Sequence, residues 1–156
     1  MKSIYSYIYE NTDTLTELLD NTLRKNNDQL IISYDPDDNL HLDMANRYGL
    51  SELIMKRDDS QKKMFHTKNT VVELVSIQVA PKLRGKGLAK IVLHEIADWA
   101  DKHNYVITLD PDDMFNTPLQ VLYNLYGKYG FEPSERFETT PNAFGMVHKM
   151  VRFPNK

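Results

Sequence analysis

The alternation of apolar and polar positions predicts a buried strand near the middle of the chain. Residues 71–79 read VVELVSIQV, a run of β-branched and apolar side chains interrupted by the carboxylate of Glu73. Pro81 ends the strand, because proline cannot donate a hydrogen bond to a β-ladder. Helical spacing follows at Leu88, Ile91, Val92 and Ile96. The centre of the chain therefore predicts a strand, a short glycine loop and a long helix over 87–103.

The rest of the chain alternates strand and helix patterns. Strands are expected over 4–9, 29–34, 40–45, 51–56, 105–109, 136–140 and 145–153, and helices over 15–23 and 119–129. The polar stretch 58–69 is expected to be a mobile loop or a solvated hairpin end. Strand 105–109 follows the central strand after one helix, so the two should be parallel. This order predicts an α/β fold, a central mixed β-sheet flanked by helices.

Composition narrows the class of protein. The 156 residues are enough for a single domain spanning 1–156 with its own core. The absence of cysteine excludes disulfides, a cysteine nucleophile and thiolate metal sites, and fits a reducing, cytoplasmic location. The sequence has no run of about 18 apolar residues, so no membrane span is expected. The formal net charge of −3 argues mildly against a nucleic-acid partner.

The loop after the central strand has the chemistry of an anion site. Residues 84–89 read RGKGLA and run into the long helix. Glycines allow the backbone to approach a ligand, and a helix start offers N–H groups and partial positive charge. Arg84 and Lys86 add charge, so this segment predicts a pyrophosphate site. The alternative is a turn and helix cap whose basic side chains are merely solvated.

Two segments carry a resemblance to one family. Residues 84–89 fit the pattern R/Q-x-x-G-x-G/A, and 125–131, LYGKYGF, fit L-Y-x-x-x-G-F. In both respects the sequence resembles the GNAT N-acetyltransferase superfamily. The resemblance implies the GNAT fold and acetyl-CoA as cosubstrate, and the histidines, scattered without a ligand spacing, predict no metal. The coenzyme A contacts that it implies are Ile77, Gln78, Val79, Arg84, Gly85, Lys86, Gly87, Leu88, Ala89 and Asn116.

The resemblance also implies a proton donor. Tyr126 stands at the position of the tyrosine that protonates the departing thiolate, and the alternative is a packing tyrosine on an amphipathic helix. Tyr123 and Tyr129, on the same helix, fit that packing role more readily. Leu119 and Leu122 depart from the family, which often has asparagine and alanine there. Asn116 either replaces the asparagine or caps the helix.

Glu73 and Asp110 are alternative candidates for the base that deprotonates an amine. Glu73 is an isolated carboxylate in an apolar strand, and burial makes a carboxylate a stronger base. Its spacing of eleven residues to Arg84 resembles that in histone-acetylating GNAT enzymes. Asp110, at the end of the following strand, matches other family members, although its DPDD context also fits a simple turn. The sequence favours Glu73.

The predicted function is acetyl transfer from acetyl-CoA to a primary amine by direct attack in a ternary complex. The sequence does not distinguish a protein lysine or N-terminus from a polyamine or an amino sugar. A cluster formed by Asp110, Asp112 and Asp113 favours a cationic acceptor. The scattered histidines show no metal-ligand spacing. The alternative is a GNAT-fold protein that binds acyl-CoA or a partner without turnover, and a homodimer is left open.

Overall fold

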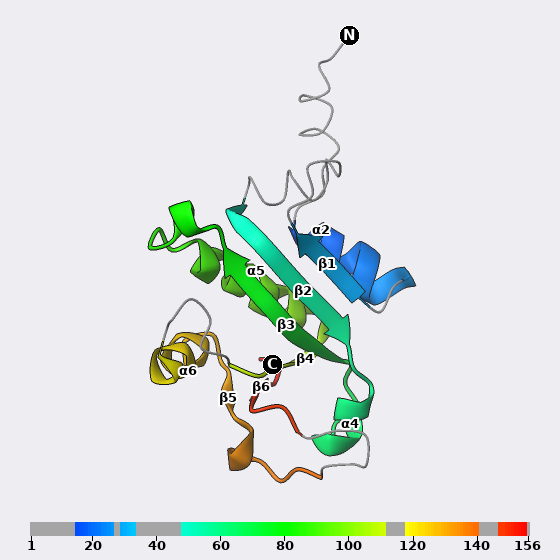
Figure 1. Cartoon of the computed structure of the whole chain (residues 1–156). Helices are drawn as coiled ribbons and strands as arrows, with labels where there is room; N and C mark the ends of the chain where they lie inside the picture. The colour runs from blue at the N-terminus through cyan, green and yellow to red at the C-terminus, as the bar shows by residue number, and fades with distance from the viewer. Residues whose placement is uncertain (1–14, 27–28, 34–47, 112–117, 141–146, 156) are drawn as a thin grey trace. The chain divides into compact units, whose positions relative to one another are not determined.

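The computed structural model describes residues 15–26, 29–33, 48–111, 118–140 and 147–155. Its strands form a six-stranded sheet in the order β1-β2-β3-β4-β6-β5 (Figure 1). The strands are β1 (Gln29–Ser33), β2 (Leu50–Arg57), β3 (Val71–Val79), β4 (Val106–Leu109), β5 (Glu132–Pro133) and β6 (Met150–Arg152). The helices are α2 (Leu15–Leu19), α4 (Ser60–Met64), α5 (Leu88–His103) and α6 (Leu119–Gly127). The α/β prediction, a mixed sheet with flanking helices, is confirmed.

Contacts along the chain divide it into two compact units. The first unit comprises Met1–Met55 and Ser76–Ile96, and the second comprises Lys56–Val75 and Ala97–Lys156. The single-domain organisation expected from length stays a prediction. Within the described residues, no helix combines the length and the apolar character needed to cross a membrane.

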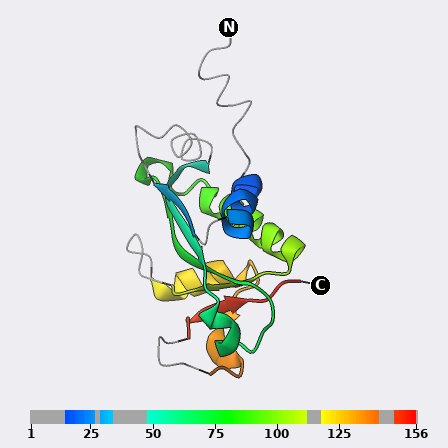
Figure 2. The same cartoon turned by 90° about the vertical axis from the view of Figure 1, so that its right-hand side faces the viewer.

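In the first unit, helix α2 continues as a π-helical segment, η1 (Asp20–Asn26), in agreement with the expected helix. Its apolar face is buried at Leu15, Leu18, Leu19 and Leu23. Strand β1 alternates between buried and exposed positions, with Leu30 and Ile32 buried and Ile31 exposed. Figure 2 shows α2 and the first turns of α5 on the same side of β1 and β2. The apolar residues of α2 and β1 are therefore buried in the same interface.

In the second unit, the strand pairings place β4 in the middle of the sheet. It runs parallel to β3, with Val71 opposite Val106 and Glu73 opposite Thr108, and antiparallel to β6. The parallel pairing predicted for residues 105–109 is confirmed. Each residue of β4 is buried, as expected for a strand covered on both edges and both faces.

A hydrophobic cluster in the second unit explains why the polar stretch 58–69 contains a helix and not only a loop. Residues Ser60–Met64 form the short helix α4, so the prediction of a loop is wrong there. Met64 and Phe65 are buried in a cluster with Val71, Val106 and Val151. These two apolar side chains fix the segment against the core, although charged residues surround them in the sequence.

The prediction of a strand over 136–140 is also wrong. Strand β5 comes earlier, at Glu132–Pro133, and a 3-10 turn, η4 (Ser134–Arg136), follows it. Phe137 then packs edge-on against Phe153, with ring centroids 5.1 Å apart, instead of continuing the strand. The expected strands at 4–9 and 40–45 lie outside the described residues.

The C-terminal strand carries a buried ion pair. Arg152 of β6 is 3 % exposed, and its guanidinium donates two hydrogen bonds of 2.8 Å to the Asp101 carboxylate. Its Nε donates to the Tyr129 carbonyl at 2.7 Å, just before Gly130, whose φ is +93°. Hydrogen bonding to Arg152 lowers the pKa of Asp101. Gly130 thus has the left-handed conformation that is common just after a helix end, and glycine adopts it without strain.

Candidate active site

Both candidate bases contact a histidine that the sequence analysis did not single out. His148 lies just before β6, with Nδ1 2.6 Å from an Asp110 oxygen and Nε2 2.8 Å from Glu73 Oε1. The backbone N–H of Lys149 donates to the other Asp110 oxygen at 2.8 Å. Glu73 and Asp110 are therefore the two ends of one hydrogen-bonded chain through His148.

The strand register explains this convergence. Leu109 at the end of β4 pairs with Met150 at the start of β6, so the residues beyond those ends, Asp110 and His148, meet. Glu73 pairs with Thr108 on the neighbouring parallel strand. It is 9 % exposed, as expected for a carboxylate inside an apolar strand.

His148 is held in its charged form. Its side chain is 16 % exposed. The hydrogen bond to Glu73 is the main reason that the pKa of His148 is raised to about 9; burial lowers the pKa, and the hydrogen bond to Asp110 and the charges of both carboxylates raise it. At neutral pH the ring is an imidazolium, and both of its N–H groups donate to carboxylates.

Two further charged groups lie beside this chain. Asp58 Oδ2 is 3.8 Å from His148 Nε2, and Ser60 donates a hydrogen bond to the same aspartate. The Lys56 ammonium is 3.9 Å from Glu73 Oε1. The group formed by Asp58, Glu73, Asp110 and His148 is called the acidic cluster below.

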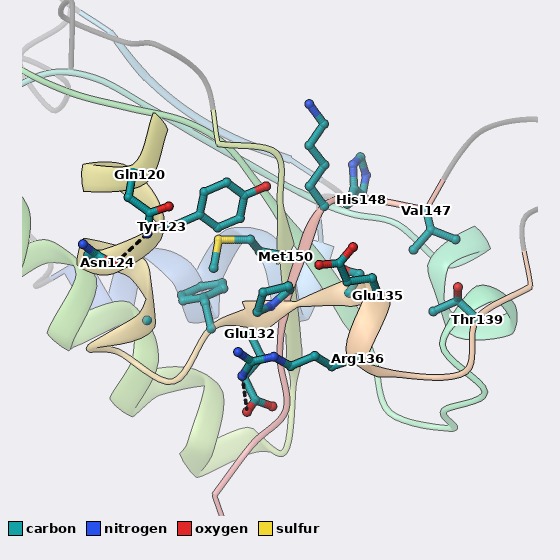
Figure 3. A pocket seen from close by; sticks show the side chains of 15 residues that line it. Gln120, Tyr123, Asn124, Glu132, Glu135, Arg136, Thr139, Val147, His148 and Met150 are labelled. Atoms are coloured by element: carbon teal, nitrogen blue, oxygen red, sulfur yellow. Dashed lines mark hydrogen bonds and ion pairs between the residues drawn. The ribbon is translucent and has the colours of Figure 1, made fainter. Parts of the chain in front are cut away.

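Two cavities in the second unit adjoin the acidic cluster. The smaller, about 550 Å³, is lined by Lys56, Asp58, Ser60, Gln61, Met64, Glu73, Asp110 and residues 147–149. The larger, about 710 Å³, is lined mainly by residues of α6, β5 and η4 together with residues 147–150 (Figure 3). Residues 147–149 belong to both walls, so His148 faces both cavities.

Part of the acidic cluster has the donor set of a metal site. One atom each from Asp58, Glu73 and His148 lies within 4.8 Å of the others. Carboxylate oxygens and an imidazole nitrogen are suitable ligands for a divalent transition metal. However, Nε2 of His148 carries a proton that donates to Glu73, and a metal ion would have to displace it. The absence of a metal stays a prediction.

Tyr126 is placed in α6 as a buried side chain. It is 5 % exposed, and its ring meets Phe131 edge-on with centroids 5.8 Å apart. Tyr123, one turn earlier, lines the larger cavity. The catalytic role of Tyr126 stays a prediction. Tyr123 is a second phenol on the same helix, and it lies at the wall of the larger cavity.

The glycine loop, in the first unit, has the backbone expected of an anion site. Gly85 and Gly87 have φ of +81° and +78°, in the left-handed region that favours glycine. Within the part of the chain that the structure describes, and apart from the neighbours in sequence, no atom lies within 4 Å of the position that a Cβ would take at either residue, so the space above the loop is open. Arg84 donates through Nε to the Val79 carbonyl at 3.2 Å, which ties the loop to the end of β3.

Helix α5 starts at Leu88, directly after this open space. Arg84 and Lys86 are exposed, while Ile77 and Val79 are buried and Gln78 is half-buried on β3. The candidate contacts 77–79 and 84–89 are therefore the end of one strand, its loop and the following helix start. Asn116, Asp112 and Asp113 lie outside the described residues.

A comparison with family models shows which protein family contains this strand, loop and helix. The model of the Acetyltransferase (GNAT) family matches residues 46–131, more than half of the chain. The chain belongs to the GNAT acetyltransferase family. A search of curated proteins returned no match. The matched range of this GNAT chain includes the glycine loop, Glu73, Asp110 and Tyr126, but it ends before His148.

His148 is the residue of the GNAT site that sequence reasoning missed. It lies 75 positions after Glu73, and its neighbours Val147 and Lys149 give it no recognisable motif. The available signal was topological. An antiparallel strand at 150–152, paired with the strand that ends at Leu109, brings the two residues before it, His148 and Lys149, beside Asp110.

Proposed function

We propose that this GNAT protein is an acetyl-CoA-dependent N-acetyltransferase that transfers an acetyl group to a primary amine by direct attack in a ternary complex. The observation that carries the proposal is the acidic cluster, in which both candidate bases hold one imidazolium at a cavity wall. Family membership supports acyl-CoA-dependent acetyl transfer in general. Acetyl-CoA, the amine acceptor and the residue roles below are parts of the proposal.

In this proposal the pyrophosphate of acetyl-CoA binds the glycine loop. The left-handed glycines and the start of α5 direct backbone N–H groups toward an anion, and Arg84 and Lys86 contribute charge. The pantetheine arm pairs with the backbone of Ile77–Val79 in the manner of an added strand. The open space above both exposed glycines leaves room for the pyrophosphate, and a plain turn would have the same space, so binding of acetyl-CoA decides between the two.

Glu73 is the proposed base. An ammonium substrate cannot attack until it loses a proton, and the second oxygen of the Glu73 carboxylate accepts that proton directly or through a water molecule. His148 is already protonated at neutral pH, so it acts as a positioning residue that holds the carboxylate by the 2.8 Å hydrogen bond. Asp110 in turn orients the imidazolium ring through Nδ1.

The acetyl group then passes directly from sulfur to nitrogen, without an acetylated enzyme as intermediate. The amine nitrogen forms a bond to the thioester carbon, backbone N–H groups stabilise the oxyanion, and the carbon–sulfur bond breaks. The departing thiolate takes a proton, for which Tyr126 is the proposed donor. The nitrogen loses its second proton as the amide forms, and this proton returns through solvent to Tyr126, which restores the phenol. The products are the N-acetylated amine and free coenzyme A, with the first proton of the ammonium on Glu73.

Two substitutions test the base assignment. Glu73→Gln should lower kcat by about 10²–10⁴-fold, the usual contribution of a positioned base, with the largest loss at low pH where the amine is most protonated. Asp110→Asn should lower kcat less, because it acts only through the ring of His148. Turnover is measured as release of free coenzyme A. The reverse ranking would make Asp110 the base, and no effect from either would remove the proposed mechanism.

The second candidate function is a GNAT-fold protein that binds acyl-CoA without turnover. It is favoured by Leu119 and Leu122, which replace residues common at these positions of the family motif. Calorimetry with acetyl-CoA, followed by a panel of amines, separates the two functions. Acetyl-CoA binding without release of coenzyme A for any amine would support the binding protein.

A further inference from the structure

The larger cavity extends the site on the other side of His148. Its walls come from α6, β5, η4 and the segment leading into β6, and it shares residues 147–149 with the smaller cavity. Figure 3 shows Tyr123 on one side of this cavity and Val147 and His148 on the other. A molecule bound against His148 in the smaller cavity could therefore extend along the same segment into the larger one.

The two cavities differ in the charges that line them. The smaller cavity gathers three carboxylates, Asp58, Glu73 and Asp110, around the imidazolium of His148, and Lys56 and Lys149 also line it. In the larger cavity only two carboxylates, Glu132 and Glu135, face three cations, Arg136, Lys149 and the same imidazolium. Glu132 is already 3.8 Å from Arg136. The larger cavity consequently has no carboxylate in excess for a second ammonium group.

The remaining walls of the larger cavity suit an uncharged body. They include two aromatic rings and three aliphatic or thioether side chains, namely Tyr123, Phe131, Pro133, Val147 and Met150. Amides and hydroxyls complete the lining at Gln120, Asn124, Ser134 and Thr139. A volume of about 710 Å³ lies in the range of sites for small molecules, and a mixed lining of this kind is typical of them.

We propose that the acceptor is a small primary monoamine with a neutral, partly aromatic body. Its ammonium group lies against the acidic cluster beside Glu73, and its body occupies the larger cavity against Tyr123. This inference rests on the proposed function and specifies its substrate class. A polyamine would place a second ammonium in the larger cavity, where cations already outnumber carboxylates, and an amino sugar would offer the aromatic walls less apolar surface than a ring without hydroxyls does.

The test uses four amines as probes. They are 2-phenylethylamine, propylamine as an amine without a ring, putrescine and glucosamine, each with acetyl-CoA. Release of coenzyme A should give a kcat/KM for phenylethylamine at least about tenfold above that of the other three, since a buried ring contributes that much to binding. Tyr123→Ala should raise KM for phenylethylamine by roughly tenfold with little change in kcat, and should leave propylamine unchanged.

Matched controls separate the inference from the proposed function. Val121→Ala, on the exposed side of the same helix, should leave every parameter unchanged. Calorimetry of phenylethylamine binding, with the wild type and Tyr123→Ala, gives a readout that does not need turnover. Binding that depends on Tyr123, without coenzyme A release for any amine, would support the amine site and remove the proposed function. Preference for putrescine, glucosamine or a lysine peptide, or a Tyr123→Ala effect equal for all amines, would overturn the inference.

Discussion

At the scale of single residues, the contacts of His148 change the choice of a catalytic base. Glu73 and Asp110 are alternatives as long as only their positions in the sequence are compared. In the folded chain they hold opposite nitrogens of the same ring, at 2.8 and 2.6 Å. Glu73 accepts from the nitrogen that faces Asp58, whereas Asp110 orients the ring from behind. The two carboxylates therefore have different contacts within one network, and the proposed mechanism gives them different roles.

The charged form of His148 predicts a pH-dependent contribution to stability. Its pKa is about 9 in the folded protein, above the ordinary value of 6.5, so this contribution is fully present below pH 6.5 and is lost as pH rises to 9. A shift of this size corresponds to about 3 kcal/mol. In His148→Gln the free energy of unfolding, measured by urea titration, should lack this decline. His94→Gln is the control and should retain the decline, and an unchanged decline in His148→Gln would contradict the assignment.

A second residue-scale prediction concerns Tyr126. Tyr126→Phe keeps the ring that packs against Phe131, so the fold should be preserved. If the phenol protonates the leaving thiolate, kcat should fall by about 10²–10⁴-fold while the acetyl-CoA Kd changes little. Tyr129→Phe, on the next turn, is the control. A Tyr126→Phe protein with wild-type kcat would show that Tyr126 only packs, and Tyr123→Phe would then be the next variant to assay.

At the scale of elements, the strand, loop and helix from β3 to α5 were the most predictable part of the chain. β-branched residues, Pro81 and two glycines specify local conformations, and the structure has them where the sequence predicts them. Helix α4 and strand β5 were missed because tertiary contacts decide them. Two apolar side chains of a polar segment, Met64 and Phe65, fix α4, and pairing with β6 defines β5.

The site shows the same division between local and long-range information. Glu73, Asp110 and the glycine loop carry local signals, such as a lone carboxylate in an apolar strand or a motif. His148 carries none, because its role depends on the pairing of β6 with β4, which joins segments far apart in the sequence. A periodic pattern identifies a strand but does not identify its partner.

Gly87 tests the glycine loop as a unit. Gly87→Glu should abolish acetyl-CoA binding in calorimetry, because the side chain places bulk and negative charge where pyrophosphate is proposed to lie. The residue has φ of +78°, so any side chain also strains the backbone. Gly87→Ala carries the same strain without the charge and should bind more weakly than wild type but measurably. Unchanged affinity in a folded Gly87→Glu protein would remove the pyrophosphate assignment.

At the scale of the whole molecule, the sheet order shows how much depends on the end of the chain. Strand β6 pairs with β4 on one side and β5 on the other, and its three residues are all buried. Arg152 of this strand also fixes α5 through Asp101 and the end of α6 through the Tyr129 carbonyl. The last strand is therefore a structural connector for the second unit as well as the carrier of His148.

The position of β6 has a consequence for the order in which the acidic cluster assembles. The segment around His148 follows Glu73 and Asp110 in the chain and is therefore synthesised after them. The earlier strands can pair before that moment, but the imidazolium can bridge the two carboxylates only after β6 has inserted between β4 and β5. A nascent chain that has not yet inserted β6 would thus hold the two carboxylates without the histidine that joins them. The acid–histidine chain is in this sense a late product of folding, formed only once β6 has paired with β4.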